Sequence, residues 1–168
     1  MLTKNFYAYI RADFSESNTA ATFTKTDGSK NRFALDGDSP PFKVMNNWAK
    51  STTEVGVSFG TGTTPATASD YALESILGDT QISVAAPNAV SYSQADTYEE
   101  YSVTFGITNK TTEAITISEV GLTAAPVIGN PDKYALVDRT VLDTPITIPA
   151  GQSKQITYTI RFNYGDAV

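Results

Sequence analysis

The sequence predicts an all-β protein, built as an antiparallel β-sandwich of the jelly-roll or immunoglobulin-like kind. The main observation is that apolar and hydroxyl side chains alternate through residues 98–108 and again through residues 153–163. A period of two places one set of side chains on a buried face of a strand and the other set in water. In addition, turn residues separate the strand-like segments at intervals of about 8 to 12 residues, which is typical of a sandwich.

The first fifty residues have a weaker pattern. We predict a partly irregular N-terminal region at residues 1–50 and a sandwich domain at residues 51–168. Residues 6–10 are rich in aromatic side chains and are compatible with a strand or with a helix that runs to about residue 14. Asp27-Gly28-Ser29-Lys30 favours a tight turn, so the segments on either side of it are predicted to form a hairpin.

The sandwich domain contains seven predicted strands joined by glycine- and proline-rich turns. Gly60-Thr61-Gly62-Thr63-Thr64-Pro65 forms a loop after the first strand, and Ser69-Asp70 could cap one helical turn that follows it. Pro149-Ala150-Gly151-Gln152 predicts a tight turn before the last strand. The predicted strands are residues 55–59, 81–85, 89–92, 98–108, 114–124, 134–142 and 153–163.

One break in the alternation supplies a candidate structural site. The apolar residues before Ser118 set a phase that buries Glu119, whereas those after it set a phase that buries Ser118. A β-bulge near these two residues would reconcile the phases. A buried Glu119 would need a cation, and Arg139 lies on an apolar face of another predicted strand. The sequence therefore offers a buried Glu119–Arg139 pair, and the alternative is that both side chains are exposed.

Composition excludes several classes of function. The 168 residues include no Cys and no His, so disulfides, thiolate sites and the commonest general base are missing. The formal net charge is −6 and the basic residues are scattered singly, so we expect neither nucleic acid nor an anionic membrane surface as a partner. No apolar segment approaches the roughly 18 residues of a membrane span, and the first residues contain no apolar signal segment. These features predict a soluble protein made in the cytoplasm.

Three candidate sites have better structural explanations. Residues 60–64 lack the Lys of a phosphate-binding loop, and we expect them instead to bend close past another backbone, within the subunit or at a neighbour. Asp36 and Asp38 lack a third oxygen ligand at the spacing of a calcium loop. Glu99 and Glu100 face opposite sides of a strand and cannot act as a glycosidase pair. We therefore expect no catalytic residues, no metal and no cofactor.

The N-terminal region also carries a candidate interface. Termini are usually disordered unless they are tied down, and an exposed aromatic patch normally marks an interface. We expect residues 1–50 to contact neighbouring subunits; the alternative is that they complete the core of their own domain. The candidate interface residues are Leu2, Phe6, Tyr7, Tyr9, Ile10 and Phe14.

Several segments, taken in order, resemble a group of small structural proteins of tailed bacteriophages and prophages. The most specific segment runs from residue 57 through the loop at 60–65 and on through Ser69-Asp70-Tyr71-Ala72-Leu73-Glu74. The other segments are residues 1–7, 27–28, 115–122, 138–142, 144–151 and 158–160. Together they span most of the chain.

This resemblance implies a non-enzymatic virion protein that is present in many copies or as a homo-oligomer and contacts capsid, neck or tail subunits. A capsid decoration or head-fibre-base protein is the first expectation, and a neck or tail protein is the second. The net negative charge disfavours the DNA-facing inner surface of a capsid. The alternative is a carbohydrate-binding sandwich that attaches to a receptor. In that case Trp48 could join Tyr7 or Tyr9 in an aromatic platform, although its apolar neighbours favour a core position.

Overall fold

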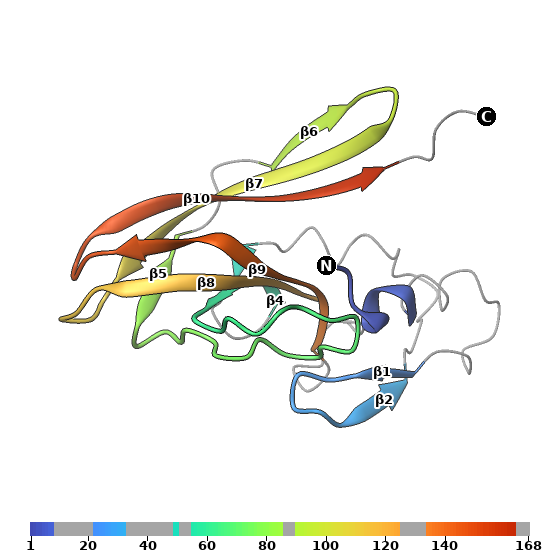
Figure 1. Cartoon of the computed structure of the whole chain (residues 1–168), viewed down its shortest axis with the longest axis horizontal. Coiled ribbons are helices and arrows are strands. Elements are labelled where there is room, and N and C mark those ends of the chain that lie inside the picture. The colour runs from blue at the N-terminus through green and yellow to red at the C-terminus, as the bar shows by residue number, and fades with distance from the viewer. Residues whose placement is uncertain (9–21, 33–48, 51–54, 86–89, 125–133, 164–168) are drawn as a thin grey trace.

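The computed structural model describes residues 1–8, 22–32, 49–50, 55–85, 90–124 and 134–163. Nearly all of the regular structure in these residues is β-strand, which confirms the predicted all-β class. Two four-stranded antiparallel sheets pack against each other as a sandwich, and a two-stranded hairpin lies beside them (Figure 1). We call the sheet that contains β7 and β10 the first sheet, and the sheet that contains β8 and β9 the second sheet.

The first sheet is built around β7 (Tyr98–Asn109), the strand with the clearest alternation. β7 pairs on one side with β10 (Ser153–Asn163), and this register is uninterrupted along the whole of β10. On its other side β7 pairs first with β6 (Val90–Gln94) and then with β5 (Ile82–Val84). The predicted outward hydroxyls form cross-strand pairs between β7 and β10, which are Ser102–Thr159, Thr104–Thr157 and Thr108–Ser153.

The second sheet has the strand order β3 (Ala49–Lys50), β4 (Val55–Gly60), β8 (Ile115–Ala124) and β9 (Ala135–Ile148). The β8–β9 register shifts between Ile117 and Glu119, which confirms the bulge predicted at this point. β9 continues past residue 142, where the sequence pattern ended, and includes Pro145. Because β9 is an edge strand with an interrupted register, a residue without an N–H is tolerated there.

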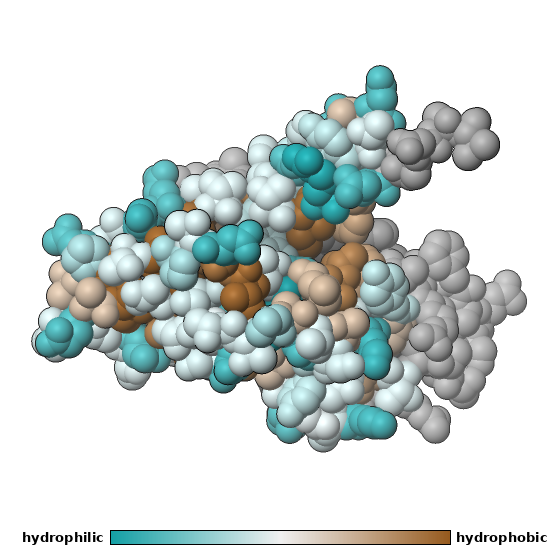
Figure 2. All heavy atoms as spheres, viewed as in Figure 1, coloured by the Kyte–Doolittle hydropathy of each residue, from teal (hydrophilic) through white to brown (hydrophobic). Residues whose placement is uncertain are grey.

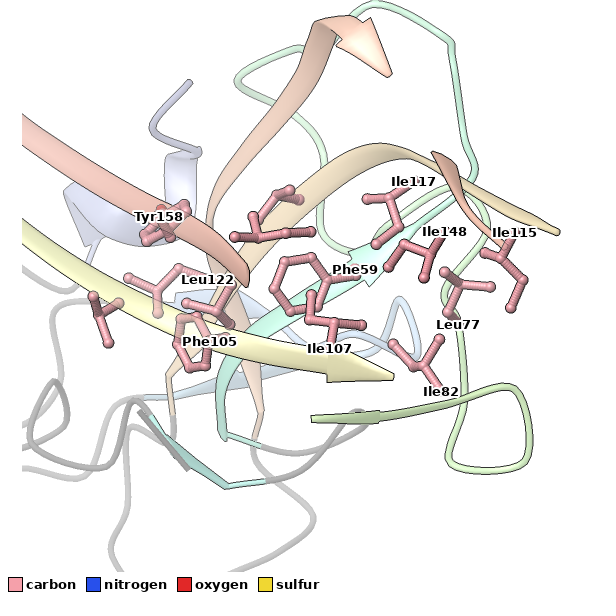
Figure 3. Close-up of a cluster of buried hydrophobic side chains, with 14 of the residues drawn as sticks. Phe59, Leu77, Ile82, Phe105, Ile107, Ile115, Ile117, Leu122, Ile148 and Tyr158 are labelled. Atoms are coloured by element: carbon pink, nitrogen blue, oxygen red, sulfur yellow. The ribbon is translucent and has the colours of Figure 1, made fainter. Parts of the chain in front are cut away.

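The hydrophobic core lies between the two sheets and explains the alternation. Phe59 of the second sheet meets Phe105 of the first with their ring centroids 6.1 Å apart. Each fully buried aliphatic or aromatic side chain of this kind contributes about 1.5–3 kcal/mol. Figure 3 shows this cluster, which includes Phe59, Leu77, Ile82, Phe105, Ile107, Ile115, Ile117, Leu122, Ile148 and Tyr158.

The first residues of the chain join the second sheet. Thr3 N donates to Val137 O and Arg139 N donates to Met1 O, each at 3.0 Å, so residues 1–3 lie along the free edge of β9. Residues 4–8 are helical, which answers the question that the sequence left open for the start of this segment. β3 and residues 1–3 both pair with strands of the second sheet.

The predicted hairpin is confirmed as β1 (Thr22–Thr24) and β2 (Lys30–Arg32). Gly28 has a φ of 83°, a conformation that glycine adopts without strain, and Asp27 Oδ1 accepts the Ser29 amide at 2.8 Å. Asn5 ties the hairpin to the N-terminal helix, because its side chain donates to Thr24 O at 2.8 Å and accepts the Thr24 amide at 2.9 Å.

Candidate functional site: the Arg139 cluster

The structure brings the side chains of Glu119 on β8 and Arg139 on β9, two neighbouring strands of the second sheet, into contact. Arg139 Nε donates to Glu119 Oε2 at 2.9 Å. The side chain of Glu119 is 0% exposed and that of Arg139 is 4% exposed. The bulge in β8 allows this arrangement, since Ser118 and Glu119 are both buried where strict alternation would bury only one of them.

Two further carboxylates complete the site. Arg139 Nη1 donates to Asp70 Oδ2 at 2.8 Å, and Nη2 lies 3.6 Å from Glu74 Oε2. We call Asp70, Glu74, Glu119 and Arg139 the Arg139 cluster. Three carboxylates therefore surround one guanidinium, so the cluster needs positive partners beyond its own arginine.

Backbone amides of the loop between β4 and β5 supply those partners. Glu119 Oε1 accepts the amides of Gly62 at 3.1 Å and Ser75 at 2.7 Å. Glu74 Oε2 accepts the amides of Thr63 at 2.9 Å and Thr64 at 2.8 Å. Hydrogen bonds from N–H groups to ionised carboxylates are about twice as strong as neutral ones. The cluster thus clamps the whole loop onto β8 and β9.

The two loop glycines are required by this close approach. A Cβ at Gly60 would lie 2.5 Å from Glu119 Oε1 and 2.6 Å from Ser75 O, and a Cβ at Gly62 would lie 2.6 Å from Glu119 Oε1. All three distances are shorter than real Cβ contacts. The expectation that this loop bends close past another backbone is therefore confirmed, and that backbone belongs to the same subunit.

The helical turn predicted after Ser69 is wrong. Residues 71–75 are not helical, and Asp70 closes a turn with Thr67 instead. The Thr67 amide donates to Asp70 Oδ2 at 2.9 Å and the Thr67 hydroxyl donates to Oδ1 at 2.7 Å. The Asp70 carboxylate is thereby fixed between Thr67 and Arg139, and it is not available to cap a helix.

The same contacts keep the outer carboxylates ionised. Burial pushes the pKa of Asp70 upward, but hydrogen bonds from the Thr67 amide and Arg139 outweigh burial and lower the pKa overall. Hydrogen bonds from the amide and hydroxyl of Thr64 lower the pKa of Glu74. A general acid or base works best with a pKa near the operating pH, and these two groups are shifted away from it.

These shifts predict acid sensitivity with a defined sign. A carboxylate whose pKa is lower in the folded state stabilises the fold above its unfolded pKa of about 4, and that stability is lost as the pH falls through the folded value. We expect the free energy of unfolding, measured with urea, to be flat near pH 6 and to decrease below about pH 4. Asp27, whose pKa is lowered to about 2, also titrates in this range. Asp70→Asn isolates the contribution of the Asp70 carboxylate to the cluster. Because the parent loses this contribution when Asp70 is protonated, the free energy of unfolding of the variant should approach that of the parent as the pH falls. A difference that stays constant from pH 6 to pH 2 would contradict the assignment.

The candidate interface residues are only partly where the sequence put them. Leu2 and Phe6 are half-buried, and Phe6 packs on the hydrophobic core, whereas Tyr7 is 56% exposed. Residues 1–8 are therefore tied to their own domain, as in the alternative that the sequence left open, and Tyr7 remains on the surface. Tyr9, Ile10 and Phe14 lie outside the described residues, as do Asp36, Asp38 and Trp48.

The two adjacent acidic residues of β7 bind separate partners. Glu100 pairs with Arg161 of β10 at 2.6 Å, and Glu99 Oε1 accepts the Tyr92 hydroxyl of β6 at 3.1 Å. Their opposite orientations are those expected for neighbours on a strand.

A chain of aromatic contacts, which the sequence analysis missed, crosses the first sheet. The rings of Tyr7, Phe6, Phe162, Tyr101 and Tyr92 follow one another with centroids 5.2–6.3 Å apart. Figure 2 shows hydrophobic side chains between the projecting end of β6, β7 and β10 and the rest of the molecule. Successive rings are inclined by 85°, 25°, 75° and 51°, so they share no common plane.

Within the described part of the chain, every buried side-chain nitrogen and oxygen has a hydrogen-bond partner. Across the same residues, no group of three or more acidic, His or Cys side chains could hold a metal ion. The buried polar atoms of Glu119 and Arg139 therefore have their hydrogen bonds within the fold. None of the described helices is long and apolar enough to cross a membrane.

Comparisons with protein-family models, with curated proteins and with solved structures find no match to this chain.

Proposed function

We propose that this chain is a non-enzymatic structural protein of a bacteriophage virion, with the outside of the capsid as its first location and the neck or tail as its second. The observation that carries the proposal is the ordered resemblance of its segments to small phage structural proteins. The remaining support comes from where those segments lie in the fold.

The most specific of the resembling segments and two of the others meet at the Arg139 cluster. Residues 57–65 and 69–74 form the clamped loop, residues 115–122 supply Glu119, and residues 138–142 supply Arg139. Every member of this cluster is engaged in holding the fold. The segments that resemble small phage structural proteins would therefore be those that keep the sandwich rigid. A subunit that is repeated many times in a large assembly needs such rigidity.

The aromatic chain favours assembly over the carbohydrate-binding alternative. A sugar ring stacks on the open face of an aromatic ring, and Tyr92 and Tyr7 are the exposed ends of the chain. The rings between them are half-buried and inclined to one another, so they provide contact surface without a flat platform. Such a mixed aromatic and polar surface is typical of protein–protein contacts.

Quantitative mass spectrometry of purified particles tests this proposal. Phage particles from the strain that encodes the chain would be isolated after prophage induction, and the protein counted against labelled reference peptides. Symmetric assemblies predict roughly dozens to hundreds of copies on a capsid shell and about six or twelve at a neck or tail. Absence of the protein from particles that contain the major capsid protein would overturn the proposal.

A further inference from the structure

β10 is a long strand, and among the described residues no strand pairs with its outer edge. It has eleven residues, contains no proline, and pairs on one side only with β7 in a register without a bulge. Its only charged residues are Lys154 and Arg161, near its two ends. Strands of this kind are templates for pairing with another chain, and proteins normally shield them.

The other sheet edges among the described residues are shielded or short. The edge of β9 is covered in part by residues 1–3 and carries Pro145. β3, β5 and β6 have two, three and five residues. None of the backbone hydrogen bonds in the described structure reaches the outer edge of β10.

The register identifies which backbone groups face outward. Asn109 N donates to Gln152 O at 2.9 Å, and the pairing of β7 with β10 continues this register. Because bonded and non-bonded pairs alternate in an antiparallel ladder, even-numbered residues of β10 direct their N–H and C=O groups toward β7. The odd-numbered residues, Gln155, Thr157, Thr159 and Arg161 among them, direct theirs away from the sheet.

Among the described residues, the second sheet extends one strand further than the first sheet on the side of β10. The Tyr158 hydroxyl donates to Asp138 Oδ2 at 2.8 Å, so β10 lies over β9 at this point. Leu2 pairs with Asp138 on the outer edge of β9, which places its side chain on the same, inter-sheet face. Residues 1–3 therefore widen the second sheet by one strand, and within the described ranges no strand of the first sheet lies opposite it beside β10. Leu2 is only half-buried there.

We propose that the outer edge of β10 binds an extended segment of another polypeptide, which adds a strand to the first sheet and covers Leu2. The segment would alternate apolar side chains toward Leu2 with small polar ones outward, and it would place no basic residue opposite Lys154 or Arg161. A two-fold pair of whole copies fits less well, because the widened second sheets would meet before the two β10 strands came within bonding distance. This inference does not depend on the proposed virion function.

A synthetic peptide with the sequence of residues 153–163 is a suitable probe. When the peptide pairs antiparallel to β10 with its Tyr158 opposite Tyr158 of the protein, Lys154 of each strand lies opposite Phe162 of the other. Arg161 of each strand likewise lies opposite Gln155 of the other, so no like charges face each other. We expect saturating peptide to slow hydrogen exchange of the Gln155, Thr157 and Thr159 amides about tenfold or more. A peptide of the same composition without alternation should leave exchange unchanged.

Modified peptides test the geometry without altering the protein. Methylation of the peptide nitrogens at Thr157 and Thr159 removes the donors that face β10, and should weaken binding about tenfold or more. Methylation at Ile156 and Ile160 affects nitrogens on the far side of the added strand and should change the affinity much less. Equal effects of the two modifications would overturn the proposal.

Protein variants provide the complementary test. Thr157→Pro removes an outward N–H while keeping the ladder to β7, and should lower peptide affinity about tenfold. Thr157→Ala loses the same hydroxyl pair with Thr104 but keeps the N–H, and should bind like the parent. Unfolding temperatures of both variants verify the fold. If the peptide gives no exchange protection in the parent protein, the edge does not bind an extended segment. If the protein alone forms a dimer that Thr157→Pro abolishes, the edge pairs with a second copy instead, and the proposal is likewise wrong.

Discussion

Replacing Arg139 with alanine is expected to lower the free energy of unfolding by about 3–5 kcal/mol, because it leaves a buried carboxylate without its cation. The Glu119 side chain is fully buried, and the guanidinium also binds Asp70 and the carbonyl oxygen of Thr64. Urea unfolding followed by fluorescence and by circular dichroism measures the loss. Coincident transitions by the two probes would establish that the variant still unfolds in one step.

Arg161→Ala is the matched control. It removes the same charge from another strand of the sandwich, where the arginine binds Glu100 and lies over the ring of Tyr98. The Arg161 side chain is 52% exposed, so solvent screens its ion pair and the loss should be much smaller. Similar losses in the two variants would mean that burial of the Arg139 cluster has no special energetic weight.

Gly60→Ala is expected to cost about 1–3 kcal/mol by overpacking. The added methyl group would lie 2.6 Å from the carbonyl oxygen of Ser75, which is backbone and cannot swing aside, and 2.5 Å from Glu119 Oε1. Relief of the clash requires the loop or Glu119 to move, and either movement weakens the bonds that hold the cluster together. The measurement is again equilibrium unfolding.

Gly78→Ala controls for the general effect of removing a glycine. A Cβ at Gly78 would meet nothing within 4 Å, while the reduction in unfolded-chain entropy is similar to that at Gly60. We expect stability within about 0.5 kcal/mol of the parent. If Gly60→Ala is as well tolerated as Gly78→Ala, the loop does not approach Glu119 as closely as described.

The sequence predicted the strands well because their pattern is local. Alternation placed β10 at its observed bounds and located the bulge at Ser118–Glu119. The same logic offered Arg139 as a candidate partner of Glu119, since a buried carboxylate needs a cation, but it left open the alternative that both side chains are exposed. The continuation of β9 was missed because Pro145 normally ends a strand, and only its edge position makes it acceptable.

The rest of the site depends on contacts that no local pattern encodes. Asp70 lies 69 residues from Arg139 in the sequence, and the Glu74 amide donates a hydrogen bond to the Glu119 carboxylate, 45 residues away. The loop that carries them has no periodicity, so Asp70 was given a helix-capping role that its residue type allows but its partners exclude. The presence of two glycines in six residues, 60–65, was the one available signal, and it indicated a close approach without naming the neighbour.

The pairing of residues 1–3 with β9 has a consequence for the order in which the chain can fold. Arg139 N donates to Met1 O across 138 positions of sequence, so residues 1–3 cannot pair with β9 until the ribosome has released residue 139. Contacts of such long range require large loops to close and slow the search for the native topology. Until β9 and β10 have been synthesised, Leu2 lacks Asp138 and Phe6 lacks Phe162, and both side chains remain available to chaperones or to other nascent chains. Residues 1–3 are therefore expected to join the sandwich only after β9 has formed.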